Sequence, residues 1–100
     1  MTKTLEFENA ESIDSNGIHG GTFEIVLMGD FGTLLANVEV EHEFDDSEIY
    51  TNASVVNLRQ LDQNDNSAEL TFTEKEVESF IESDLAIDEF FEDRIQGLAE

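Results

Sequence analysis

The chain has 100 residues, no cysteine and no proline, and its 25 acidic residues against four lysines and arginines give a formal net charge of -21. One hundred residues suffice for one domain with a modest core, and the lack of cysteine excludes disulfides and thiolate sites. The charge disfavours contact with nucleic acid or anionic membranes and favours partners with basic grooves. Eight phenylalanines and 39% apolar residues predict a folded domain rather than a disordered chain.

The first third of the chain predicts two strands separated by a loop. Residues 4–8 alternate polar and apolar side chains, as a short strand does. Residues 9–21 contain Asn, Asp, Ser and Gly and are expected to form a loop. Residues 22–28 are the next expected strand, and residues 29–32, with a glycine at each end, are the expected reversal after it.

Residues 33–45 show the clearest strand pattern of the chain. The apolar face, expected to face a core, consists of Leu34, Ala36, Val38, Val40, His42 and Phe44. The opposite face carries a series of acids that we call the acid ladder, namely Glu39, Glu41, Glu43 and Asp45, and Asp46 and Glu48 continue the acidity beyond it. Alternate residues of a strand lie roughly 6.6 Å apart. This spacing is close to that of successive phosphates along a nucleic-acid backbone.

His42 lies on the apolar face of this strand, so we expect a core or edge histidine rather than a metal ligand. Its sequence neighbours Glu41 and Glu43 are expected to raise its pKa, because a nearby negative charge favours the protonated ring.

The next two strands are expected to form a hairpin. Residues 49–61 are rich in β-branched side chains, residues 62–67 are a strong turn signal, and residues 68–72 alternate with Leu70 and Phe72 directed inward. These elements complete the expected sheet.

The C-terminal part of the chain predicts two helices. Thr73 and Glu76 have the spacing of a capping box at the start of the first helix. The apolar positions change phase near Ser83 and Asp84, so we place a break there and the end of the second helix at Gly97. This region is also strongly acidic, with nine carboxylates between residues 74 and 93 against one lysine.

The order of these elements predicts an α+β fold, an antiparallel sheet of about four to five strands followed by two C-terminal helices packed on one face. We expect residues 1–100 to form a single acidic domain, with strands within residues 4–72 and helices within residues 74–97. The N-terminal region lacks the apolar run of a signal peptide, and no stretch is long enough to span a membrane, so a cytoplasmic location is expected.

No arrangement of residues indicates a catalytic site, so we do not expect an enzyme, and we expect no cofactor or metal. The acidic and amide residues within 62–66 have part of the spacing of a calcium loop. Ser67 and Thr73, however, stand where such a loop needs glycine and glutamate, which favours an ordinary turn.

With its acids concentrated in residues 38–48 and 74–93, the chain resembles the small acidic DNA-mimic proteins, many of them phage-encoded anti-restriction or anti-CRISPR inhibitors. The resemblance lies in charge and architecture, because such mimics share no sequence motif. It implies a phage protein in the host cytoplasm that occupies the basic nucleic-acid-binding groove of a host defence complex and blocks access of DNA. The residues expected to bind this partner are Glu39, Glu41, Glu43, Asp45, Asp46, Glu48, Glu74, Glu78, Glu82, Asp88, Glu89, Glu92 and Asp93.

Two alternatives also fit the composition. The chain is an acidic interaction or structural module for a basic partner without DNA mimicry, or its acidity is an adaptation to a high-salt cytoplasm. A salt-adapted protein is expected to unfold at low ionic strength, whereas a mimic stays folded there and loses its partner as salt rises.

Overall fold

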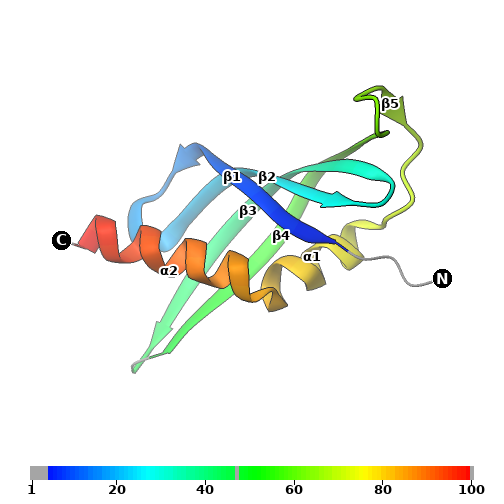
Figure 1. Ribbon diagram of the computed structural model, residues 1–100. Helices are drawn as coiled ribbons and strands as arrows, with labels where there is room; N and C mark the ends of the chain where they lie inside the picture. The colour runs from blue at the N-terminus through cyan, green and yellow to red at the C-terminus, as the bar shows by residue number, and fades with distance from the viewer. Residues whose placement is uncertain (1–4, 47, 100) are drawn as a thin grey trace.

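The computed structural model describes residues 5–46 and 48–99, so residue 4, at the start of the first expected strand, lies outside the described residues. Five antiparallel strands are followed by two helices (Figure 1), which confirms the predicted α+β fold. The strands are β1 (Glu6–Ser15), β2 (Gly20–Gly29), β3 (Gly32–Asp45), β4 (Glu48–Leu61) and β5 (Ser67–Ala68), and the 3-10 turn η1 (Gly17–His19) lies between β1 and β2. The helices are α1 (Glu74–Ser83) and α2 (Leu85–Ala99).

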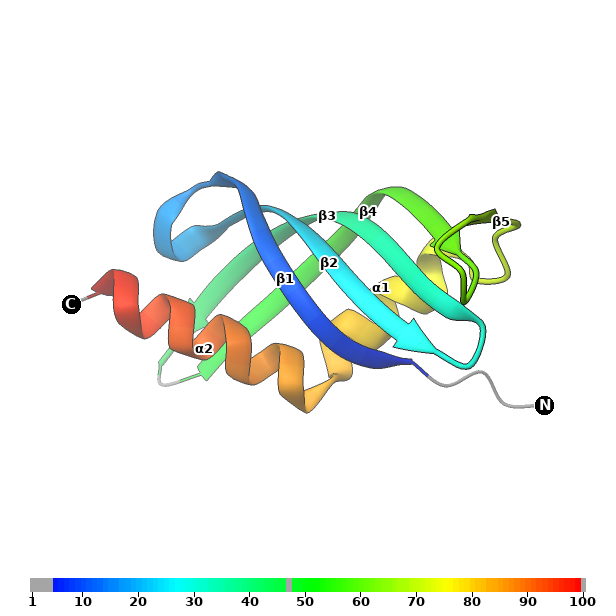
Figure 2. The same cartoon turned by 45° about the horizontal axis from the view of Figure 1, so that its top comes forward.

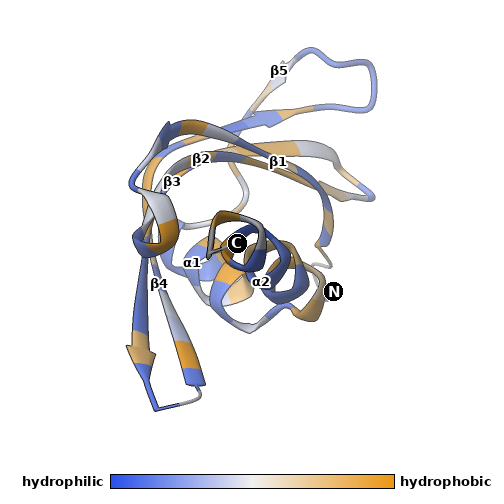
Figure 3. Ribbon diagram, turned by 90° about the vertical axis from the view of Figure 1, so that its left-hand side faces the viewer, coloured by the Kyte–Doolittle hydropathy of each residue, from blue (hydrophilic) through white to orange (hydrophobic). Residues whose placement is uncertain are grey.

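Each strand pairs with its neighbour in sequence, so the sheet order is β1-β2-β3-β4-β5 (Figure 2). The sheet curves over both helices, which lie on the same side of it, and the end of the β3–β4 hairpin projects past them (Figure 3). We call the side that faces the helices the inner face and the opposite side the outer face. The inner face and the helices enclose one core, which contains Phe23, Ile25, Leu27, Leu34, Ala36, Val38, Val40, Ala53, Val55, Phe72, Val77, Ile81, Ile87 and Phe91.

The prediction of a loop over residues 9–21 was wrong for its first part, because β1 continues to Ser15. Pairing with β2 is interrupted by register shifts between Phe7 and Asn9 and between Ser12 and Asp14. Such irregularities break the period-2 pattern by which a strand is recognised in a sequence. As an edge strand, β1 also presents mostly exposed side chains, which explains its polar composition.

The strand predicted over residues 68–72 was also wrong in extent. Only Ser67 and Ala68 pair with β4, and Leu70 is 46% exposed rather than inward, whereas Phe72 is buried as expected. The side chain of Gln60 accepts hydrogen bonds from the backbone N–H and the hydroxyl of Thr71, at 2.9 and 3.2 Å. A side-chain contact thus replaces the strand pairing, and the chain leaves the edge of β4.

The local signals for the helices are confirmed at their start and at the break between them. Thr73 caps α1, with Thr73 and Glu76 exchanging both hydrogen bonds of a capping box. Asp84 separates the helices, because its N–H donates to Phe80 and its carboxylate accepts from the N–H of Ile87. The predicted end at Gly97 was wrong: α2 runs through this residue to Ala99.

A membrane-spanning helix is not found among the described residues, since none of their helices combines the necessary length with an apolar composition.

Candidate acidic interaction surface

The acid ladder lies on the outer face of the sheet. Val38, Val40 and His42 point into the core, so the strand alternation turns Glu39, Glu41 and Glu43 to the opposite side, where all three are exposed. The expected separation of a core face from an acidic face along β3 is therefore observed as far as His42, whereas Phe44, expected on the core face, is 45% exposed.

The residues paired with the first three acids of the ladder are uncharged. Glu39 lies between Thr22 and Ser54 of the adjacent strands, and Glu41 lies between Gly20 and Asn52. The paired residue of Glu43 on β4 is Tyr50. Opposite charges on neighbouring strands are the usual way in which a sheet compensates a charged residue. The fold leaves the charges of the ladder without such neighbours.

Two acids that the sequence analysis did not select extend the negative charge across the outer face. Glu11 of β1 and Glu24 of β2 are paired residues. Glu24 lies between the inward side chains of Phe23 and Ile25, so both glutamates face outward. Like charges directly opposite each other are destabilising. Glu11 was missed because it fell in the expected loop, while the alternation around Glu24 was the signal that could have identified it.

The remaining acids within residues 38–48 lie at the end of the β3–β4 hairpin. Asp45 and Glu48 are paired, and Asp46, which follows in the turn, has a positive φ of 53°. All three are exposed. The hydroxyl of Tyr50 donates a short hydrogen bond to the carboxylate of Glu48, and this bond raises the pKa of Tyr50. The acidic end of the hairpin thus projects from the body of the protein (Figure 1).

Two of the helical acids are turned toward the sheet. The carboxylate of Glu82 accepts the backbone N–H of Ala53 at 3.0 Å, and that of Glu78 accepts the N–H of Val55 at 2.9 Å. Both donors lie on β4, along the edge that α1 covers. One oxygen of each carboxylate therefore replaces the carbonyl of a missing neighbouring strand. Glu74, in the first turn of α1, is exposed.

The acids of α2 differ in their exposure. Glu89, Glu92 and Asp93 are exposed, whereas Asp88 is half-buried. Burial raises the pKa of Asp88, and repulsion from Glu92 and Asp84 raises it further. Asp88 is therefore a carboxylate held close to other negative charges.

The acids within residues 38–48 and those within residues 74–93 do not form one flat surface. The ladder lies on the outer face, while α1 and α2 pack on the inner face (Figure 3), so the two groups of acids belong to opposite layers of the molecule. A flat partner can contact only one of these groups at a time.

The expected effect of Glu41 and Glu43 on His42 was wrong. His42 is only 3% exposed, its Nδ1 lies 3.0 Å from the Thr51 hydroxyl, and its ring contacts that of Phe91 at a centroid distance of 5.1 Å. Burial lowers the pKa of His42, and the positive charge of Arg94 lowers it further. The two glutamates point to the opposite face of the sheet, so they do not offset the desolvation.

The turn at residues 62–66, which has part of the spacing of a calcium loop, is stabilised by the side chain of Asp62. Asp62 Oδ1 accepts the backbone N–H groups of Asn64 and Asn66, at 2.8 and 3.0 Å. Within residues 5–46 and 48–99, no group of three or more side chains is arranged to hold a metal ion.

No protein-family model, curated protein or solved structure matches this chain.

Proposed function

We propose that this protein is a DNA-mimic inhibitor that occupies the basic nucleic-acid-binding groove of a host defence complex, of the CRISPR or restriction type, and blocks access of DNA. The observation that carries the proposal is the row of Glu39, Glu41 and Glu43, which are exposed on the outer face and whose paired residues on the adjacent strands are all uncharged. A row of uncompensated charges lowers stability through self-repulsion. Contact with a basic partner would remove this cost.

The overall dimensions support the same proposal. The molecule measures 42 × 26 × 19 Å and has a formal net charge of -21. A DNA duplex carries one charge per 1.7 Å of its axis, so a length of 42 Å corresponds to about 25 charges. The protein thus approaches a duplex of its own length in charge, in a body that is similarly elongated.

The mechanism is competitive. Ladder carboxylates pair with lysine and arginine side chains that otherwise bind phosphates. A single exposed pair contributes at most about 1 kcal/mol, so affinity arises from many pairs together. Their summed field accelerates association, and salt weakens it. The helical acids on the opposite side of the molecule contribute when the groove of the partner encloses the protein rather than contacting one face.

The test is a pull-down of binding proteins from bacterial lysate by the immobilised protein, with and without an excess of competing duplex DNA. We expect DNA-binding proteins in the eluate and their loss when duplex DNA is added, because both ligands use the same groove. Captured proteins that duplex DNA does not displace, or an eluate without DNA-binding proteins, would contradict the proposal.

A further inference from the structure

Residues 49–52 of strand β4 form a stretch of open edge. On this side of β4 the N–H of Ala53 is accepted by Glu82, as described above, and β5 pairs only at the far end of the strand. Residues 49–52 lie beyond the contact with Glu82. Alternate residues of an antiparallel strand direct their N–H and C=O groups to the same edge. Because the register is regular here, Ile49 and Thr51 direct theirs to the same side as Ala53.

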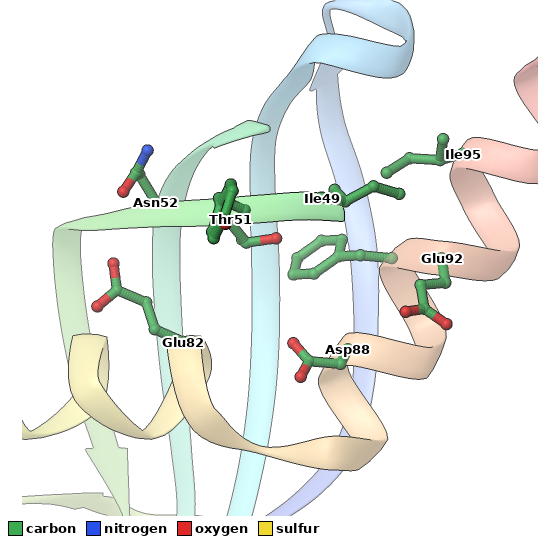
Figure 4. Close-up of a pocket in the computed structure, with 9 residues that line it drawn as sticks. Ile49, Thr51, Asn52, Glu82, Asp88, Glu92 and Ile95 are labelled. Carbon is green, nitrogen blue, oxygen red and sulfur yellow. The ribbon is translucent and has the colours of Figure 1, made fainter. Parts of the chain in front are cut away.

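This edge opens into a cavity between β4 and the helices (Figure 4). The cavity has a volume of about 340 Å³ and is lined by residues 49–52 together with side chains of both helices. Phe91 and Ile95 of α2 form its apolar part, and the side chain of Ile49 beside them is 41% exposed. The space therefore combines apolar contact area with main-chain groups of an open strand.

The charged residues of this cavity are all acidic. Glu82 from α1 and Asp88 from α2 extend into the space between the helices and β4 (Figure 4), and Glu92 also lines it. None of the described residues that line the cavity is basic. The raised pKa of Asp88 reflects its burial and its repulsion from Glu92 and Asp84, and a cation placed here would relieve that repulsion.

We propose that this cavity binds an extended, basic peptide segment of a partner protein, which adds to the sheet as a strand beside residues 49–52 of β4. The main chain of the peptide pairs with the N–H and C=O groups of Ile49 and Thr51. Every second side chain points to the inner face, where a lysine or arginine places its charge near Asp88 and Glu92 and its aliphatic stem against the exposed side chain of Ile49. Charge selects this occupant, because pairing with a second copy of the chain would join two molecules of net charge -21.

This binding surface is separate from the acid ladder and does not depend on DNA mimicry. The ladder lies on the outer face, whereas the cavity lies between the edge of the sheet and the helices. A partner can occupy one surface while the other stays free.

The experiment measures the affinity of the intact protein for two probe peptides by isothermal titration calorimetry. The first peptide is acetyl-Arg-Val-Arg-Val-Arg-amide, and the second is the same peptide with every backbone nitrogen methylated. The two have the same charge, but only the first can donate the hydrogen bonds of a strand. We expect the methylated peptide to bind at least about tenfold more weakly. Equal affinities would overturn the proposal, because they would show attraction by charge alone.

Two pairs of variants locate the site. Ile49→Pro removes a main-chain donor from the open edge without removing a bond to β3, while Ile49→Ala keeps the donor and removes the side chain. We expect about tenfold weaker binding of the unmethylated peptide for Ile49→Pro than for Ile49→Ala. Asp88→Asn should weaken binding severalfold, whereas Glu89→Gln, which removes the same charge outside the cavity, should leave it within about twofold.

Equal binding by both members of each pair would overturn the proposed location. If Ile49→Pro fails to fold, the comparison of the two peptides on the unchanged protein still decides the question. Sedimentation of the protein alone tests whether a second copy of the chain occupies the edge instead. A dimer that Ile49→Ala retains and Ile49→Pro loses would assign the edge to this second copy and overturn the proposal.

Discussion

Adjacent residues of β3 occupy opposite environments, and this alternation decides what each side chain experiences. Glu41 and Glu43 are exposed to solvent, while His42 between them is buried against Phe91. The sequence places a histidine between two carboxylates, yet the structure places those carboxylates across the sheet from the ring. The charge that the ring experiences comes instead from Arg94, which α2 brings to the inner face.

We predict that His42 lowers the stability of the protein as the pH falls. The unfolded chain takes up a proton near the ordinary pKa of 6.5, whereas burial lowers the pKa in the folded state. Below about pH 6.5 the unfolded state therefore binds more protons, so the contribution of His42 to stability is complete above this pH and declines below it.

The measurement compares melting temperatures at about pH 7.5 and pH 5.5 for the protein and for His42→Leu. All other ionisable groups are the same in both proteins, so the difference between the two pH dependences isolates His42. The unchanged protein should lose more stability than the variant on acidification. Equal losses would show that the ring does not resist protonation.

At the scale of elements, α1 does more than cover the core. Its glutamates Glu78 and Glu82 accept N–H groups of β4 and so protect part of an edge that would otherwise pair with another chain. The spacing of four residues places both carboxylates on one side of the helix. There they accept the N–H groups that Ala53 and Val55 direct to the edge of the sheet. A helix thus substitutes for a sixth strand along this segment.

We predict that Glu78→Ala and Glu82→Ala each destabilise the protein by about 1 to 2 kcal/mol, because each leaves a part-buried backbone donor without its acceptor. The matched variants Glu78→Gln and Glu82→Gln keep a side-chain oxygen and should lose less. Urea unfolding measures the free energy of all four variants. Equal losses for alanine and glutamine would assign the effect to charge rather than to the hydrogen bond.

Elements with strong local signals were predicted well from the sequence, and elements held by tertiary contacts were not. The capping box at Thr73 and the break at Asp84 depend on residues a few positions apart, and both were found. The later half of β1 and the loss of pairing after Ala68 depend on β2 and on Gln60, which are distant along the chain. Gly97 was taken as a helix end because glycine commonly caps helices, but α2 continues through it.

At the scale of the whole molecule, the fold divides the acidic residues between two sides. Glu39 and Glu41 represent the outer face, and Glu89 and Asp93 represent the helix layer. The strength of binding to a captured partner should therefore depend on which side is changed.

We predict that Glu39→Lys with Glu41→Lys weakens binding to the captured partner by about tenfold or more, since two favourable pairs of up to about 1 kcal/mol each become repulsive. Glu89→Lys with Asp93→Lys makes the same change of net charge on the other side and is the matched control. Binding is measured at two salt concentrations, and the effect should shrink as salt rises. A weaker effect of the outer-face variant than of the control would remove the ladder from the interface.

The sequence by itself determined the charge of the protein, the alternation along β3, the start of α1 and the order of strands before helices, because these follow from composition and from contacts between near neighbours. Only the tertiary structure decided the surroundings of each acid. Pairing and packing between distant segments give Glu39, Glu41 and Glu43 uncharged neighbours and bring Glu78 and Glu82 to the edge of β4. They also place the strand acids and the helix acids in opposite layers. Electrostatic interactions depend on distances and burial in space, and spacing along the chain does not determine either for residues in different elements.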